Sequence, residues 1–356
     1  MRKVRVALWG LGAMGKGIAG LLLSRRGVEI VGVCDVNPAY SGKSLHQVLG
    51  LAQEGQAVVP VSADIATALS AMPVDCCVIA TDSFAEGVFP KIREVVTRKI
   101  NVVTIAEEMS YPAAQSPELA AEMDRLAKEN GVSILGTGIN PGLMMDLLAV
   151  CLSGAMTRVS HVRCERVNSL SPFGEIVMHE QGIGITVEDF DRGVLDGSLA
   201  GHVGFHESAA MIAKALGLSY DILQQQMLPI ITKVDRRSPH GFAARGHVAG
   251  VNMTAQALQD GQEVISLIHP QQIEPEQVGV DTGDYITLTG EPPIRMAVKP
   301  EVNGGLGTIA MACNVLPFVV AARPGLLTML DIPVPRCVMG DYRDIAFPGG
   351  QHGQEG

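Results

Sequence analysis

The chain has 356 residues, of which 47% are hydrophobic and 18% are charged, and its formal net charge is −10. A chain of this length usually exceeds one hydrophobic core, so we expect two domains. The negative charge argues against a nucleic-acid partner and an anionic membrane surface, because either would favour a basic face.

A glycine-rich turn follows the first apolar run. Residues 4–15 read VRVALWGLGAMG, so the run leads directly into a G-x-G-x-x-G spacing. In a strand-turn-helix context these glycines permit the turn, the approach of a pyrophosphate and the packing of the helix on the strand. We therefore predict a dinucleotide site that includes Gly10, Gly12, Ala13, Met14 and Gly15.

A second apolar run, residues 28–35, ends at Asp35. A carboxylate about twenty residues after the turn can accept hydrogen bonds from both ribose hydroxyls and would repel a 2′-phosphate, which favours NAD. Asn37, Ser41 and Lys43 follow and could tolerate a phosphate. NADP therefore stays open.

Apolar runs and helical patterns alternate from residue 1 to residue 152. The expected strands are residues 4–10, 28–35, 74–81, 101–107 and 132–138, and the expected helices are residues 15–25, 43–49, 84–99 and 117–130. This alternation predicts an α/β domain of Rossmann type, with a doubly wound parallel sheet. We assign residues 1–152 to this dinucleotide-binding domain.

Polar residues at the later strand ends are candidate ligand contacts, because ligands bind beyond the carboxyl ends of the strands in open parallel sheets. Thr81, Asp82 and Ser83 are expected to line the cofactor. Asn140 is expected to contact the nicotinamide amide or the substrate. It is also expected to cap a helix that begins at Leu143.

Two adjacent glutamates, Glu107 and Glu108, follow the apolar run NVVTIA. A carboxylate at a strand end beside the cofactor can hold an ammonium group and accept protons. Alternation along the strand would send the two side chains to opposite sides, so one of them would reach the nicotinamide, and Glu108 is slightly favoured. The alternative is that the pair only begins the next loop or caps a helix.

From residue 153 to residue 303 the pattern changes to that of an α+β insert with a mainly antiparallel sheet. Strands are expected at residues 161–169, 227–237, 247–259, 262–273, 284–290 and 294–300, and a helix at residues 206–216. We expect this domain to bind the substrate and to form a homodimer face. The candidates for anchoring a carboxylate or moving protons are Arg166, Asn168, His179, His202, His206 and His269.

An apolar helical pattern follows Asn303, Gly304 and Gly305 and runs to about Ala322, with its longest apolar stretch at residues 309–322. Arg323, Pro324 and Gly325 end it. We expect residues 304–345 to pack back on the first domain and residues 346–356 to form a flexible tail. The pattern contains an asparagine and a proline and is short for a membrane span. No signal peptide is recognised at the N-terminus.

The seven cysteines include no C-x-x-C pair, and most lie in apolar runs. They are expected to be free thiols in a reducing compartment, which points to the cytoplasm. No cluster with zinc-ligand spacing is found, so no metal is expected.

Five segments together resemble the 2,4-diaminopentanoate dehydrogenases and the related amine dehydrogenases, whose N-terminal domain is of dihydrodipicolinate-reductase type. These segments are GLGAMG at residues 10–15, TIAEEMSYP at 104–112, GTGINPG at 136–142, GHVGFHESAAMIAKALG at 201–217 and the segment from NGGLGTIAMACN to DIPVP at 303–335. The first is generic to dinucleotide folds, whereas the combination of the others is restrictive.

The resemblance implies oxidative deamination of 2,4-diaminopentanoate at C4. The products would be 2-amino-4-oxopentanoate, ammonia and a reduced nicotinamide, as in ornithine degradation. In the related amine dehydrogenases a glutamate serves the reacting amine, and the match falls on Glu107 and Glu108.

Four alternatives remain. The enzyme could act on simple amines and ketones. Homoserine dehydrogenases and dihydrodipicolinate reductases look similar at the start, but the second-domain motif of the reductases has no match here, and Lys214, Lys233 and Lys299 lie in no recognised catalytic context. A non-catalytic NAD sensor would keep the glycine turn and Asp35 but would not need the paired glutamates.

Overall fold

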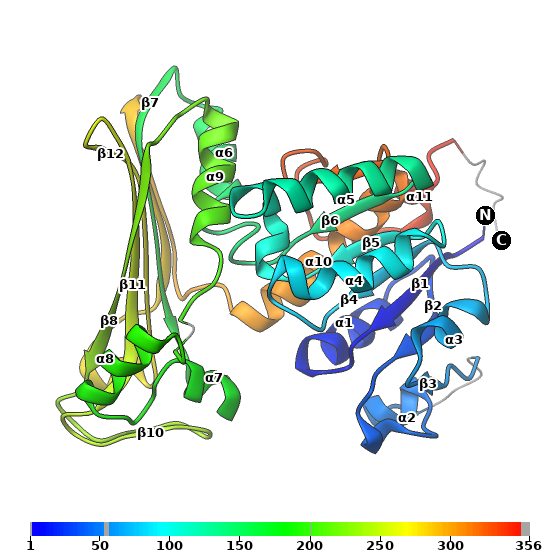
Figure 1. Cartoon of the computed structure of the whole chain (residues 1–356), viewed down its shortest axis with the longest axis horizontal. Helices are drawn as coiled ribbons and strands as arrows, with labels where there is room; N and C mark the ends of the chain where they lie inside the picture. Colours follow the sequence, from blue (N-terminus) through cyan, green and yellow to red (C-terminus); the bar gives the residue numbers. More distant parts are fainter. Residues whose placement is uncertain (1, 53–56, 200, 350–356) are drawn as a thin grey trace. The chain divides into compact units, whose positions relative to one another are not determined.

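A computed structural model describes residues 2–52, 57–199 and 201–349 (Figure 1). The chain divides into two compact units. Unit 1 comprises Met1–Gly142 and Gly304–Gly356, and unit 2 comprises Leu143–Asn303.

Unit 1 contains a seven-stranded sheet in the order β15-β6-β5-β4-β1-β2-β3, in which every pairing is parallel. Its strands are β1 (Val4–Trp9), β2 (Val28–Cys34), β3 (Val61–Ser62), β4 (Cys76–Ile79), β5 (Asn101–Thr104), β6 (Ser133–Gly136) and β15 (Gly325–Leu327). The strand order reverses at β1, which has β2 on one side and β4 on the other. This arrangement confirms the expected Rossmann-type fold and places a ligand crevice beyond the carboxyl end of β1.

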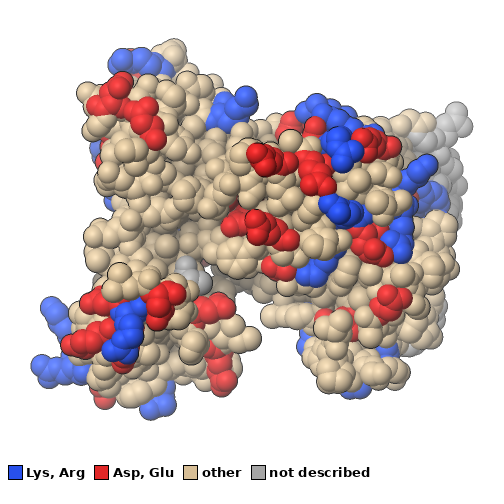
Figure 2. Space-filling view, in the orientation of Figure 1, with Lys and Arg blue, Asp and Glu red and all other residues tan. Residues whose placement is uncertain are grey.

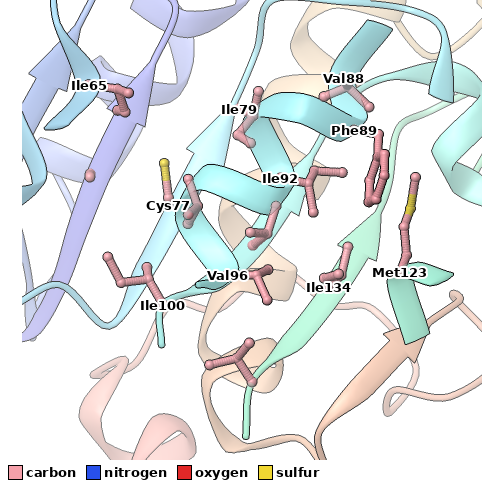
Figure 3. Packing of buried hydrophobic residues seen from close by; sticks show 14 of the residues in the cluster. Ile65, Cys77, Ile79, Val88, Phe89, Ile92, Val96, Ile100, Met123 and Ile134 are labelled. Carbon is pink, nitrogen blue, oxygen red and sulfur yellow. The ribbon is translucent and has the colours of Figure 1, made fainter. Parts of the chain in front are cut away.

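The helices of unit 1 follow the strands in sequence. They are α1 (Ala13–Leu23), α2 (Leu45–Leu49), α3 (Ile65–Ser70), α4 (Ala85–Val96), α5 (Pro117–Asn130), α10 (Gly304–Ala321) and α11 (Arg343–Ala346). In α4 the buried residues Val88, Ile92 and Val96 recur every four positions and therefore form one face of the helix. Figure 3 shows this face packed among Ile79 and other side chains of the core. Each fully buried side chain of this size contributes about 1.5–3 kcal/mol of hydrophobic stabilisation.

Helix α10 has 18 residues and is apolar enough, by length and composition alone, to cross a membrane. The sequence pattern predicted this helix at nearly the same bounds. Within unit 1 the helix packs against α1, β5 and β6, and the Cys313 Sγ lies 3.7 Å from the carbonyl oxygen of Ile18. Its burial is that of a core helix.

Unit 2 contains a six-stranded sheet in the order β14-β13-β7-β12-β11-β8. Its strands are β7 (Arg158–Ser169), β8 (Ile222–Ile231), β11 (Val248–Gln259), β12 (Gln262–Gln272), β13 (Gly283–Glu291) and β14 (Ile294–Val298), and a separate hairpin joins β9 (Arg236–Arg237) to β10 (Phe242–Ala243). Only the β7–β12 pairing of this sheet is parallel, so the sheet is mainly antiparallel as expected.

Helices α6 (Leu147–Ser153) and α9 (Phe205–Leu216) cover one face of the unit 2 sheet (Figure 1). Alternate residues of β7 and β12, such as Cys164 and Leu267, form a hydrophobic core with Ala209 and Ile212 of α9. Two further helices, α7 (Glu175–Glu180) and α8 (Val187–Asp196), lie between β7 and α9 in the sequence. This packing defines a helix-covered face whose polar residues form the candidate site described below.

Several elements differ from the expectation. The first unit ends at Gly142 rather than at residue 152, because α6 packs on α9, β7 and β13 within unit 2. The sequence analysis did not predict the short β3, α3 and β15, or helices α7 and α8. In the expected flexible tail, Ala346 ends α11, and residues 350–356 lie outside the described residues.

Candidate active site

The glycine turn joins β1 to α1 in unit 1. Gly10 has φ of 103°, and a Cβ added there would lie 2.6 Å from the carbonyl oxygen of Ala80. A Cβ at Gly15 would lie 1.9 Å from the carbonyl oxygen of Gly10. Both positions therefore require glycine for the close approach of turn, strand and helix.

The N-terminus of α1 is available to an anion. Gly12 is the N-cap residue and offers no side-chain cap, and no described atom lies within 4 Å of a Cβ added there. The first N–H groups of an α-helix, here those around Ala13 and Met14, have no acceptor within the helix and favour negative charge. The turn thus has the space and the donors that a pyrophosphate needs.

Asp35 lies beside this turn. Its carboxylate accepts the N–H of Leu11 through Oδ2 and the N–H of Asn37, at 2.7 Å, through Oδ1. These contacts fix the side chain at the end of β2, and each carboxylate oxygen retains a lone pair for a ribose hydroxyl.

A cation not singled out in the sequence lies near the same loop. The Lys16 Nζ is 5.2 Å from the centre of the Tyr40 ring, and the Tyr40 hydroxyl lies 3.4 Å from the carbonyl oxygen of Leu11. Lys16 follows the last glycine of the turn, so the motif itself was a signal for its location.

The three polar residues after β4 have different surroundings. The Thr81 Cγ2 lies 2.8 Å from the position that a Cβ of Gly10 would occupy, so Thr81 borders the turn. The Asp82 carboxylate is bound by the Lys91 Nζ of α4 at 3.0 Å. The carbonyl of Ser83 accepts the N–H of Glu108 at 3.2 Å. Asp82 thus has an ionic partner in the protein itself.

Glu107 and Glu108 lie in a short 3₁₀ helix, Glu107–Ser110, that follows β5. The expectation that both lie on a strand and alternate is therefore wrong, because β5 ends at Thr104. The Glu108 Oε2 accepts the N–H of Ala85, the first residue of α4, at 2.7 Å, and the N-cap residue Phe84 offers no side-chain cap. Glu108 therefore caps α4, and Glu107 beside it is half-buried.

Asn140 follows β6 and carries an amide group whose Nδ2 and Oδ1 are both buried and have no hydrogen-bond partner among the described residues. Buried amides are nearly always satisfied, so this group points to a ligand with both a donor and an acceptor. The expected N-cap role is wrong. Residues 140–146 form turns, and α6 begins at Leu147 with the side chain of Asp146 as its cap.

The structure brings Arg166, Asn168, His202 and His269 together in unit 2. Arg166 lies opposite Asp284 of β13, and the two side chains form a buried ion pair. The Arg166 Nη2 also donates to the carbonyl of Val302. This charge pair is closed within unit 2, so Arg166 does not present an uncompensated positive charge.

The two histidines of this group are in contact. The centres of the His202 and His269 rings are 4.8 Å apart with the rings perpendicular, and the His269 Nδ1 lies 2.7 Å from the carbonyl oxygen of Arg166. Because a carbonyl only accepts, Nδ1 carries the proton and Nε2 carries the lone pair. Burial lowers the pKa of His202 to about 3 and holds the pKa of His269 well below its usual range. Both rings are neutral at physiological pH.

Neutral buried histidines make the stability of unit 2 depend on pH. In the unfolded chain these histidines bind protons below about pH 6.5, whereas in the folded chain they do not, so stability is complete above pH 6.5 and is lost as the pH falls toward 3. The loss is at most about 1.4 kcal/mol per pH unit for each histidine. We expect His202→Gln to reduce this slope in urea unfolding followed between pH 7 and pH 4. An unchanged slope would contradict the assignment.

Further polar atoms around the two histidines lack partners among the described residues. They are the Asn168 Oδ1, the Gln181 Oε1, the His202 Nε2 and the Gln271 Nε2. Gln271 pairs in register with Asn168 on β7, and the Gln181 Nε2 donates to the carbonyl of Gly201, next to His202, at 2.9 Å. Sequence reasoning missed both glutamines, since a single glutamine carries no catalytic pattern. His179 lies on α7 and His206 on α9.

A Rossmann-type sheet with an open helix N-terminus, joined in one chain to a second, α+β unit, is typical of two-domain nicotinamide-dependent dehydrogenases. A family model described as the C-terminal domain of 2,4-diaminopentanoate dehydrogenase matches residues 143–347. A 2,4-diaminopentanoate dehydrogenase from Acetoanaerobium sticklandii is 54% identical over 97% of this chain and 98% of its own length. The chain belongs to the 2,4-diaminopentanoate dehydrogenase family.

More distant relatives agree with this class. An amine dehydrogenase from Streptomyces virginiae is 24% identical over 93% of this chain and 96% of its own length. The solved structure of an amine dehydrogenase from Mycobacterium smegmatis is 29% identical, with a TM-score of 0.82 over 94% of this chain and 97% of that chain. The predicted resemblance is confirmed, and the chain is an NAD(P)-dependent oxidoreductase that acts on CH–NH2 groups.

Proposed function

We propose that this enzyme oxidatively deaminates 2,4-diaminopentanoate at C4 and releases 2-amino-4-oxopentanoate and ammonia in ornithine degradation. The observation that carries this proposal is the 54% identity to a 2,4-diaminopentanoate dehydrogenase over nearly the whole of both chains. The glycine turn, the glutamate pair and the polar group in unit 2 supply the parts that the reaction needs.

The residues around the glycine turn fit a nicotinamide dinucleotide, which accepts a hydride from the substrate carbon when it is bound. The N–H groups at Gly12, Ala13 and Met14 would bind the pyrophosphate. Asp35 would bind the ribose. The unpartnered amide of Asn140 can donate to the carboxamide oxygen of the nicotinamide and accept from its NH2 group. Thr81 and Ser83 would border the bound cofactor.

Asp35 supports a preference for NAD, whereas Lys16 beside Tyr40 offers a cation that a 2′-phosphate could use. We expect Asp35→Ala to raise the KM for NAD about 10- to 100-fold, since a hydrogen bond to a charged group contributes about 1.5–3 kcal/mol. The KM for NADP should change less. Lys16→Ala serves as the opposite control and should weaken NADP more than NAD. Equal weakening of both cofactors by Asp35→Ala would remove the ribose assignment.

Glu107 is the proposed general base, because the carboxylate of Glu108 already caps α4. Glu107 would take a proton from the C4 ammonium, so that the nitrogen lone pair assists departure of the hydride. Once this proton has passed to solvent, the same carboxylate would stabilise the resulting iminium and accept a proton from the water that attacks C4. It would then return that proton to the nitrogen that leaves as ammonia. Loss of ammonia completes the ketone.

Unit 2 would bind the end of the substrate that does not react. Its carboxylate would meet an N–H donor of the polar group, the Gln271 Nε2, which has no partner among the described residues. Asp284 and the carbonyl of Val302 hold the Arg166 guanidinium beside it. The backbone carbonyl of Arg166 also fixes the position of the His269 ring.

We also propose an oligomeric state, a cellular location and a kind of partner for the enzyme. We propose a homodimer, because helices α6 and α9 cover one face of the unit 2 sheet while Ile222 and Leu228 of the edge strand β8 stay exposed. A cytoplasmic location is supported by seven unpaired cysteines. On the face in Figure 2, acidic and basic side chains are intermixed, which suits a small-molecule substrate better than nucleic acid.

A second candidate is an amine dehydrogenase that acts on simple amines. The Mycobacterium smegmatis amine dehydrogenase structure favours it, since its fold matches along most of both chains. The two candidates differ in whether the substrate carries a carboxylate and a second amine.

Reduction of NAD and of NADP by the purified enzyme distinguishes these two candidate functions. It is followed with 2,4-diaminopentanoate, a 2-aminoalkane, homoserine or no added substrate. The proposal expects turnover with the diamino acid at a kcat/KM at least about 100-fold above that for the plain amine, which corresponds to about 2.7 kcal/mol of binding energy. Comparable rates with the plain amine would assign the enzyme to the second candidate. Cofactor binding without turnover of any substrate would favour a sensor.

A further inference from the structure

We propose that Gln181 and Asn168 bind the second ammonium group of the substrate, the one at C2 that does not react. This inference rests on the proposed function and names the residues that distinguish a diamino acid from a monoamine. Both side chains are 6% exposed, and each has one buried oxygen with no partner among the residues that the structure describes.

The orientation of both amides makes their free atoms acceptors. The Gln181 Nε2 donates to the carbonyl of Gly201 at 2.9 Å, so the end that remains is the oxygen Oε1. The Asn168 Nδ2 lies 3.4 Å from the carbonyl oxygen of Ser169, which leaves Oδ1 free in the same way. His269 adds a third acceptor, its Nε2 lone pair. Three acceptors match the three N–H donors of an ammonium group.

A series of contacts connects the three side chains within unit 2. Gln181 binds Gly201, the next residue His202 touches the ring of His269, and His269 binds the backbone of Arg166. Asn168 lies two residues after Arg166, on the same face of β7. Helix α7, which Gln181 follows, also packs on this end of the sheet through the buried side chains of Met178 and Leu170.

The charges among the described residues in this part of unit 2 are compatible with an ammonium group. The negative charge of Asp284 compensates the positive charge of Arg166, and both histidines are neutral. The described residues of this group therefore do not repel an ammonium strongly. The unsatisfied acceptors would be costly in a buried site without a donor, because each loses its hydrogen bonds to water. A ligand ammonium removes this penalty at Gln181 and Asn168 together.

The test compares 2,4-diaminopentanoate with 4-aminopentanoate, which lacks only the C2 ammonium. The variants are Gln181→Met and Asn168→Leu, which remove the acceptor at similar size, and Asn168→Asp, which keeps it and adds charge. Gln277→Met, at an exposed glutamine, is the matched control. Where 4-aminopentanoate reacts too slowly, its inhibition constant against the diamino acid gives the same comparison, and melting temperatures verify that each variant folds.

We expect Gln181→Met and Asn168→Leu to lower kcat/KM for the diamino acid about 10- to 100-fold and to change the value for 4-aminopentanoate less than about 3-fold. Asn168→Asp should retain the diamino acid and weaken 4-aminopentanoate, whose carboxylate then meets a like charge. Equal losses for both substrates would show a merely structural role and overturn the inference, although the proposed function would stand. A wild-type enzyme with no activity on the diamino acid would instead overturn both.

Discussion

Replacing Glu107 with glutamine is expected to lower kcat for 2,4-diaminopentanoate by about 100-fold or more, because general-base catalysis contributes about 10²–10⁴ in rate. Glutamine has nearly the same shape but cannot accept the proton of the C4 ammonium. Binding of NAD and the melting temperature should stay near the wild-type values. The loss should therefore appear in kcat rather than in cofactor affinity.

Glu108→Gln is the matched control, with the same substitution one residue away. The glutamine Oε1 can still accept the N–H of Ala85, so the cap of α4 survives and activity should remain within about tenfold of wild type. Glu108→Ala should lower stability by about 0.5–2 kcal/mol through loss of this cap. A large loss of kcat in Glu108→Gln together with normal turnover in Glu107→Gln would exchange the two roles. Normal turnover in both variants would remove the carboxylate from the mechanism.

Replacing Asp284 with alanine is expected to lower the free energy of unfolding by about 3–5 kcal/mol, because it leaves the guanidinium of Arg166 buried without its counter-ion. The two side chains are 2% and 3% exposed, and Asp284 also accepts the N–H of Val302 at 2.8 Å. Urea unfolding followed by far-ultraviolet circular dichroism measures the loss. Trp9, the one tryptophan, lies on β1, so its fluorescence follows unit 1 separately.

Asp281→Ala is the control for this variant. Asp281 lies three residues away, is 85% exposed and pairs with Lys299 at 3.7 Å, so its removal should change stability by less than about 1 kcal/mol. The double variant Arg166→Met with Asp284→Leu should recover much of the loss, because no buried charge remains. If Asp284→Ala were as stable as Asp281→Ala, the ion pair would contribute nothing to the folded state.

Local patterns in the sequence were sufficient to predict most of unit 1. The run before Gly10, the spacing of the three glycines and Asp35 each depend on neighbouring residues, and the structure has β1, α1 and β2 at nearly the expected bounds. Helix α5 has the expected bounds because Pro117 and Gly131 mark its two ends. The two-residue strand β3 has no such marks.

The roles of single side chains depend on contacts that are distant in the sequence. Glu108 caps a helix that begins 23 residues earlier, and the partner of Arg166 is 118 residues away, so neither contact has a local signal. Asn140 had a convincing local pattern for a cap, but the chain forms turns there and the cap falls on Asp146. Gln181 became a candidate only when its contact with Gly201 left Oε1 unsatisfied.

The most direct measurement follows a deuterium label from C4 of 2,4-diaminopentanoate during reduction of NAD or NADP, with both products identified by mass spectrometry. We expect the reduced nicotinamide to gain one deuterium, and unlabelled 2-amino-4-oxopentanoate and ammonia to accompany it in equal amounts. Retention of the label in the organic product, with reduction of the nicotinamide from C2 instead, would contradict the assignment of the reacting carbon. Absence of any reduction would contradict the proposed reaction itself.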